Sequence, residues 1–211
     1  MHHLIEIWFG WVKSGGYLGI IVLMAMESSV IPVPSEIVIP PAAFLAAQGN
    51  LSFAGVILAG TLGSYLGAAI SYWVSLWVGR AFILRFGKFF LIGPDKLERA
   101  ETWLARYEAG GVFFARLLPV IRHLISIPAG IVRMNFWIFS LVTIAGSAVW
   151  CGVLTYLGVK AYRLQPDLID NPDGLIAFMK GQSHWIVLIV AALAVLYLLV
   201  LRLTARPSET R

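Results

Sequence analysis

The chain has 211 residues, of which 59% are hydrophobic and only 13% are charged, and its formal net charge is +5. Soluble domains usually contain about 45–50% apolar and about 25% charged residues, so this composition excludes an ordinary soluble protein. The basic residues flank apolar segments, where membrane topology accounts for them, and nucleic acid is not expected as a partner. We predict an all-α integral membrane protein with a single membrane domain over residues 1–211.

Residues 1–14 are expected to form a helix that lies in the membrane interface. Four apolar side chains recur on one helical face of this segment: Leu4, Ile5, Trp8 and Trp11. The segment has neither a basic start nor a small-residue cleavage pattern after a short apolar run, so we do not expect a cleavable signal peptide.

Residues 15–49 form an apolar segment that the stretch ESSVIPVPSE interrupts with two prolines, Pro32 and Pro34. Proline removes an amide donor and blocks the preceding helical turn, which leaves arms too short to cross a membrane. A crossing needs about 20 residues, and broken backbone at membrane depth is tolerated only where protein buries it or it lines a wet cavity. We therefore expect a re-entrant hairpin here.

Three long segments predict transmembrane helices, at 50–79, 134–160 and 184–204. Each contains a run of at least 18 residues without a charge. The first carries small residues at spacings that let helices approach closely: Gly60, Gly63, Ser64, Gly67, Ala68 and Ser71. The only cysteine, Cys151, lies in the second span, which excludes an intramolecular disulfide and a cysteine metal cluster. No metal or cofactor is expected.

Charges between the spans orient the chain. Residues 80–109 carry six basic and four acidic residues and include an amphipathic helical pattern over 95–108, whereas the loop at 161–183 has no basic excess. Cytoplasmic loops carry the excess of Lys and Arg. We therefore expect 80–109 and the C-terminal tail in the cytoplasm and 161–183 outside it.

Residues 110–133 are apolar but broken by Pro119 and Pro128, which predicts a second re-entrant hairpin. A glycine pair precedes each hairpin, and an asparagine lies near the start of each following span. Because the first span crosses the membrane once, the second unit is inverted relative to the first. The expected fold is an inverted repeat of a re-entrant hairpin plus a long transmembrane helix, with an added C-terminal transmembrane helix. Such repeats with broken helices are typical of transporters.

The charges inside the membrane segments separate by sign. Between residues 14 and 79 two side chains are charged, Glu27 and Glu36, and between residues 109 and 159 three are charged, Arg116, Arg122 and Arg133. A charge at the bilayer centre costs at least ~2.5–3.5 kcal/mol. These groups must therefore pair, contact water or bind a ligand. Arg133 lies near a hairpin end, from which its side chain can reach the lipid headgroups.

Two interpretations of these charges are open. The glutamates can simply neutralise Arg116 and Arg122 across the hairpin interface. Alternatively, Pro119 turns both arginines toward one cavity, where their guanidinium forks bind a phosphate. Glu27 or Glu36 could then gain a proton as phosphate replaces it at the arginines, and we favour Glu27 for this role. No catalytic residue is identified, because the chain has no HExxH, GxSxG or P-loop pattern, and an enzyme is the minority interpretation.

The chain resembles the DedA membrane proteins, which carry the SNARE-associated or VTT domain. Three stretches carry this resemblance in the family's order: ESSVIPVPSE, GSYLGAAISYWVSLWVGR and FFARLLPVIRHLISIPAGIVRMNFWIFS. The residues of the third stretch that fall on the family pattern are Arg116, Pro119, Arg122, Ala129, Gly130, Met134 and Phe139. The family's essential residues map onto Glu27, Glu36, Arg116 and Arg122, although some members place the second acid farther along the chain as an aspartate.

The resemblance implies a lipid flippase or scramblase that spans the bacterial inner membrane several times and depends on the proton motive force. Undecaprenyl phosphate is the first candidate lipid, and a phospholipid such as phosphatidylethanolamine is the second. A membrane lipid phosphatase and an envelope assembly factor are the alternatives. The expected partners are phosphate-headed membrane lipids and protons, and a homo-oligomer is compatible with this interpretation.

Overall fold

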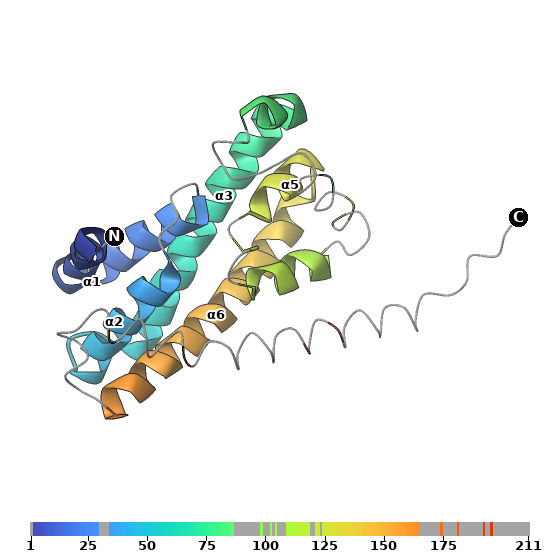
Figure 1. The fold of residues 1–211 in the computed structure, drawn as a ribbon. Coiled ribbons are helices and arrows are strands. Elements are labelled where there is room, and N and C mark those ends of the chain that lie inside the picture. Colours follow the sequence, from blue (N-terminus) through green and yellow to red (C-terminus); the bar gives the residue numbers. More distant parts are fainter. Residues whose placement is uncertain are drawn as a thin grey trace, which may run out of the picture.

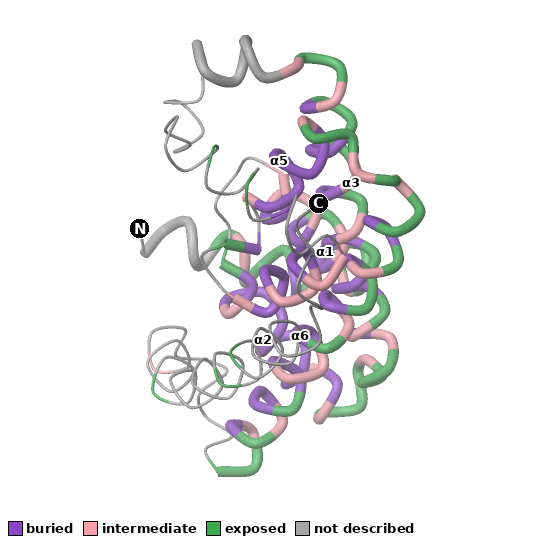
Figure 2. Tube along the Cα trace, turned by 90° about the vertical axis from the view of Figure 1, so that its right-hand side faces the viewer, coloured by how far each residue is buried: buried purple, intermediate pink, exposed green. Residues whose placement is uncertain are grey.

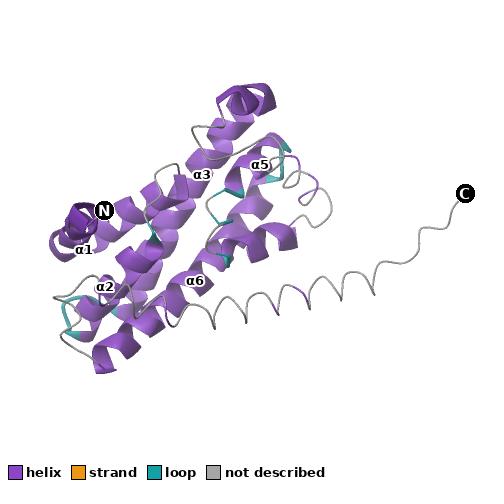
Figure 3. Ribbon diagram, in the orientation of Figure 1, coloured by secondary structure: helices purple, strands orange, loops and turns teal. Residues whose placement is uncertain are grey.

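The structure, a computed structural model, describes residues 2–29, 34–86, 109–118, 121–122 and 124–164, together with single residues at 98, 102, 104, 174, 181, 192 and 195. Within these ranges the regular elements are helices, as predicted (Figure 3). Pro32, Pro119 and most of the predicted elements at 95–108 and 184–204 lie outside the described residues.

The first apolar segment forms two helices. Helix α1 spans His2–Ser29 and bends at Gly16, whose φ of 51° is a left-handed conformation that glycine adopts without steric cost. The bend separates the predicted interfacial helix from the first arm of the predicted hairpin. Helix α2 spans Ser35–Ala47 and follows Pro34, which is extended. The proline-containing break is therefore present, whereas re-entry into the membrane stays a prediction.

Two long helices follow the predicted spans closely. Helix α3 spans Phe53–Phe86 and α6 spans Phe136–Leu164. The stretch Phe53–Gly79 of α3, and all of α6, are long and apolar enough to cross a membrane. Helix α3 continues past the predicted end of the span, with a kink at Gly79, whose φ is 74°. Helix α6 likewise ends four residues later than predicted, because Ala161 to Leu164 add another helical turn.

The outer surface of α3 is apolar. Four side chains at four-residue spacing are exposed on it: Leu58, Leu62, Leu66 and Ile70. Soluble monomers rarely expose an apolar stripe of this length, and contact with lipid tails explains it. Trp137, Leu141 and Tyr156 give α6 a similar exposed surface.

Helices α3 and α6 run antiparallel and side by side (Figure 1). Their contacts show the direction, since Ser64 meets Ser147 while Tyr72, farther along α3, stacks on Phe139, earlier in α6. Helix α2 packs against α6, and the short helix α5, Ser126–Ile131, packs against α3 near the opposite end of the pair. Figure 2 shows the buried positions along the sides of these helices that face one another.

The second broken segment ends in the same way as the first. Residues 109–116 are helical, and turns then lead to α5. At the end of α5 the Met134 amide donates to the Ala129 carbonyl, and at the end of α2 the Asn50 amide donates to the Leu45 carbonyl. Both are bonds of the Schellman type, which close a helix after a left-handed residue. That residue is Arg133 in one unit and Gly49 in the other.

The two long helices also begin alike. The Ser52 hydroxyl accepts the Gly55 amide before α3, and the Asn135 side chain accepts the Trp137 amide before α6. Side-chain oxygens at this position satisfy amides that the first helical turn leaves without partners. Together with the Schellman-type bonds, this supports the internal repeat.

The small residues of α3 bring α1 close, as predicted. A Cβ atom on Gly63 would lie 2.4 Å from the Ile21 carbonyl oxygen, and one on Gly67 would lie 2.2 Å from the Ala25 carbonyl oxygen. Because the helices are so close, the hydroxyl oxygens of Ser64 and Ser28 lie 2.9 Å apart and form a buried hydrogen bond. The small side chains of glycine and serine thus let the two backbones come into contact and form hydrogen bonds at this interface.

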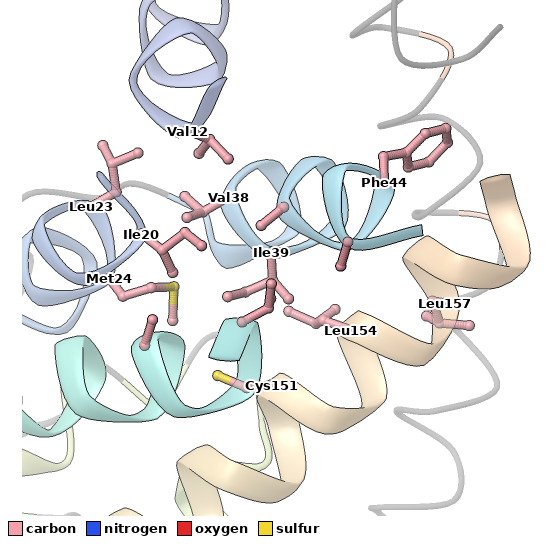
Figure 4. Close-up of a cluster of buried hydrophobic side chains, with 14 of the residues drawn as sticks. Val12, Ile20, Leu23, Met24, Val38, Ile39, Phe44, Cys151, Leu154 and Leu157 are labelled. Atoms are coloured by element: carbon pink, nitrogen blue, oxygen red, sulfur yellow. The ribbon is translucent and has the colours of Figure 1, made fainter. Parts of the chain in front are cut away.

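A hydrophobic cluster joins α1, α2, α3 and α6 at one end of the molecule (Figure 4). It includes Ile20 and Met24 of α1, Ile39 of α2, and Cys151 and Leu154 of α6. The cysteine is buried in this cluster, which agrees with a packing role.

We predict that Gly67→Ala destabilises the protein. The new Cβ would overlap a backbone carbonyl that cannot rotate away, and overpacking of this kind costs about 1–3 kcal/mol. Gly152→Ala on α6 is the matched control, because nothing lies within 4 Å of the added atom. Thermal unfolding in detergent should show a lower Tm for the first variant only, and equal Tm values would contradict this account of the α1–α3 contact.

Candidate functional site

Three of the charged groups singled out in the sequence are buried together between the helices. Glu27, Arg116 and Arg122 are 3%, 1% and 2% exposed. Glu36 is partly exposed, and Arg133 is exposed at the end of the second broken segment, where the sequence placed it near the membrane surface. The structure therefore separates one inner group of charges from two outer ones.

Glu27 and Arg122 form an ion pair between the two broken segments. Nη2 of Arg122 donates to Oε2 of Glu27 at 3.1 Å. The other carboxylate oxygen, Oε1, accepts the backbone amide of Ser35 at 3.1 Å. Ser35 is the first residue of α2, so the carboxylate sits where the helix dipole and unpaired amides favour an anion. The pairing of a hairpin glutamate with a hairpin arginine agrees with the segregation of charge in the sequence.

The Ser35 hydroxyl connects this pair to two further groups. Its oxygen accepts Nη1 of Arg122 at 3.1 Å and Nε1 of Trp150 at 3.2 Å. The same hydroxyl donates to Oε2 of Glu36 over a long oxygen–oxygen distance of 3.5 Å. The guanidinium carbon of Arg122 also lies 5.5 Å from the centre of the Trp150 ring, within the range of a cation–π contact. Arg122 is thus held by α1, α2 and α6 at once.

Arg116 is held differently. Its Nη2 donates to the Ser126 hydroxyl at 2.7 Å, but Nε and Nη1 are buried and have no hydrogen-bond partner among the described residues. Gly146 of α6 makes room for the side chain, since a Cβ there would lie 2.8 Å from Cβ of Arg116. A buried charge that lacks its partner costs several kcal/mol.

The three buried charged groups do not neutralise one another. Arg116 and Arg122 contribute two positive charges and Glu27 one negative charge, which leaves one positive charge among the three buried groups. Guanidinium groups donate in a fixed fork that matches the oxygens of carboxylate and phosphate. The arrangement is therefore suited to binding an anion, and its unsatisfied donors belong to Arg116.

Sequence analysis missed three polar partners of these charges. Ser35 and Ser126 each open the helix that follows a break, and each accepts a hydrogen bond from one of the two arginines. A serine at the start of the helix after each break could therefore have been predicted as a partner of an arginine. Trp150 lies 115 residues from Ser35, and no local pattern indicates their contact. Pro34 lies at the break as predicted.

The VTT domain matches residues 33–160 of the chain. Undecaprenyl phosphate transporter A of Bacillus subtilis is 36% identical over 174 residues, covering 82% of this chain and 85% of that protein. The protein of the same name from Staphylococcus aureus is 32% identical, covering 70% and 74% of the two chains. An alkaline phosphatase-like protein of Lactococcus lactis is 34% identical, covering 88% and 86%.

No solved structure matches the chain significantly. The matched domain covers more than half of the sequence and includes every residue of the site except Glu27, and the relatives extend over most of both chains. The chain therefore belongs to the DedA family of membrane proteins, which carry the VTT domain.

Proposed function

We propose that this protein moves a phosphate-headed lipid across the bacterial inner membrane without changing it chemically. The observation that carries the proposal is the buried guanidinium of Arg116, two of whose nitrogens have no hydrogen-bond partner among the described residues, beside the Glu27–Arg122 pair. Undecaprenyl phosphate is the first candidate lipid, because two of the similar bacterial proteins bear its name. Phosphatidylethanolamine is the second.

The proposed cycle is an exchange of anions at arginine. The Glu27 carboxylate occupies the donors of Arg122 and of the Ser35 amide, which are the donors that a phosphate oxygen would use. A proton on Glu27 weakens its hold on Arg122 and frees these donors for the phosphate. Departure of the phosphate reverses the exchange. Lipid movement would thereby be coupled to protons with no covalent step.

The proposed membrane placement follows from the same groups. The two broken segments are re-entrant and meet near the bilayer midplane, so that the buried charges of Glu27, Arg116 and Arg122 face one another there. The lipid tails would remain outside, against the apolar surfaces of α3 and α6. Only the headgroup would need to enter the protein.

A membrane lipid phosphatase is the second candidate function. The observation that favours it is the Ser35 hydroxyl, which lies beside Arg122 and 3.5 Å from the Glu36 carboxylate, a geometry in which a serine could act as a nucleophile. Alkaline phosphatase-like relatives make this candidate worth testing. Reconstituted protein separates the two functions: leaflet exchange of intact labelled lipid supports transport, whereas release of inorganic phosphate, abolished by Ser35→Ala, supports the enzyme.

We predict that Arg116→Ala and Arg122→Ala each abolish lipid movement in proteoliposomes. Either change removes a guanidinium fork that the phosphate headgroup needs. Arg122→Lys should retain part of the activity, because lysine keeps the charge but cannot reproduce the separate bonds of Nη1 and Nη2.

Arg133→Ala is the matched control for these variants, since Arg133 is exposed and lies outside the buried group. It should move lipid at the wild-type rate when equal amounts of folded protein are reconstituted. Full activity of Arg116→Ala or Arg122→Ala would remove the basis of the phosphate assignment.

We also predict that Glu27→Gln abolishes the response of transport to an imposed proton gradient. Glutamine has the size of a carboxyl group but cannot carry the proton, so slow downhill exchange should persist without coupling. Glu36→Gln should keep the gradient response, because Glu36 is not paired with a buried arginine in the described part of the chain. Lipid movement is measured with and without an acid-outside gradient.

A purely structural role for Glu27 gives a different result. Removing one partner of a buried ion pair destabilises a protein by about 3–5 kcal/mol, which a thermal unfolding measurement would show. If Glu27→Gln responds to the gradient as the wild type does, Glu27 does not carry the proton.

A further inference from the structure

The hydroxyl group of Thr143 differs from those of Thr61 and Ser75, two other buried residues of the described helices. Thr61 donates to the Ile57 carbonyl at 2.7 Å, and Ser75 donates to the Ser71 carbonyl at 2.6 Å, so both are satisfied within their own helix. Thr143 is completely buried, yet its Oγ1 has no hydrogen-bond partner among the described residues. Leaving a buried hydroxyl unpaired costs about 1–3 kcal/mol.

Thr143 lies on the face of α6 that receives Arg116. It precedes Gly146 by three residues, and residues at this spacing share a face of a helix. Gly146 is the position at which a Cβ atom would touch Cβ of Arg116 and approach the Phe113 carbonyl at 3.4 Å. The face that carries Thr143 is therefore turned toward the helical segment 109–116.

Two sets of buried groups without hydrogen-bond partners among the described residues belong to facing parts of this interface: the Nε and Nη1 donors of Arg116, and the hydroxyl of Thr143 one helical turn before the glycine that meets Arg116. Neither group bonds to the other, which leaves both available to a third. Ser126 engages Nη2 of Arg116 and thereby fixes the guanidinium while its other donors remain open. The Glu27–Arg122 pair, by contrast, is satisfied on both sides.

We propose that Thr143 and Arg116 form a phosphate seat that is distinct from the Glu27–Arg122 pair, with the Thr143 hydroxyl donating to a phosphate oxygen. The inference rests on the proposed transport of a phosphate-headed lipid and assigns the two arginines different tasks. Arg116 receives the phosphate while Glu27 still holds Arg122. Arg122 joins only after the carboxylate has left it. The seat recognises the phosphate group, whether free or attached to a lipid.

Binding to purified protein in detergent tests the seat, with farnesyl phosphate, inorganic phosphate and dioleoylphosphatidylethanolamine as probes. Thr143→Val keeps the shape and removes the hydroxyl. A hydrogen bond to a charged group is worth about 1.5–3 kcal/mol, so the affinity for farnesyl phosphate should fall about ten- to a hundredfold. Thr155→Val is the matched control, because Thr155 is a second buried threonine on α6 whose hydroxyl also lacks a partner among the described residues. It should bind as the wild type does.

If Thr143→Val does not fold, a second pair of variants provides the test. Thr143→Ser keeps the hydroxyl and should retain affinity, whereas Thr143→Ala should not, although both remove the same methyl group. Weakened binding of inorganic phosphate together with farnesyl phosphate supports a seat for phosphate itself, and loss restricted to farnesyl phosphate supports a seat for the lipid headgroup.

Two negative results have separate meanings. If wild-type protein binds none of the phosphate probes, the proposed function fails and the seat fails with it. If wild type binds farnesyl phosphate and Arg116→Ala does not, while Thr143→Val and Thr143→Ala bind as tightly as Thr155→Val, the seat is overturned and the proposed function stands.

Discussion

The ion pair between Glu27 and Arg122 is the interaction on which the arrangement of the two broken segments depends. Each partner alone would be an unpaired charge in a low-dielectric interior. The desolvation free energy of several such charges would exceed the stability of a small membrane protein. Their mutual attraction alone does not offset that cost. The Ser35 amide donates to Glu27, the Ser35 hydroxyl accepts from Arg122, and the Trp150 ring lies against the Arg122 guanidinium. The pair therefore determines which helix ends must meet: the end of α1, the start of α2, and the turn that carries Arg122.

The sequence separations of the central contacts fit an internal two-fold relation. Glu27 and Arg122 lie 95 residues apart, which is also the separation of the glycine pairs that begin at Gly15 and Gly110. Residues on a two-fold axis meet their own counterparts, and this pair does so with opposite charges. The contact between Ser64 and Ser147 shows the same property in the long helices, where 83 residues separate them, as they separate the capping residues Ser52 and Asn135.

Much of this arrangement could be predicted because it follows from local chemistry. Two long charge-free runs predicted the α3 and α6 spans, prolines predicted the break before α2, and the separation of charge by sign predicted a pair between a glutamate and an arginine. The sequence favoured Glu27 as the proton carrier but left open which glutamate pairs with which arginine, because the pairing depends on which side of the α2 start faces the interior. Trp150 could not be found at all, since its contact with Ser35 arises from the packing of α2 on α6. The last turns of α3 and α6 were missed because hydropathy marks the end of an apolar run, whereas helical hydrogen bonding continues beyond that point.

In the proposed cycle, the distribution of contacts would link separation of the two broken segments to the exchange of anions at Arg122. Helices α1 and α2 pack on α3 and α6, and α5 packs on α3. Among the described residues, the hydrogen bonds that join the two broken segments are those of Arg122, to Glu27 and to Ser35. In the proposed cycle, loss of the Glu27 carboxylate from Arg122 removes one of these two connections at the same moment that it exposes donors for a phosphate, and the bond to Ser35 is the connection that remains. A transporter needs these two events to coincide, because a site that opened without its ligand would expose an unpaired buried cation, and one that bound without opening could not release. In the proposed cycle, coupling them through Arg122 leaves the two segments with fewer polar connections when the site is filled than when it is empty.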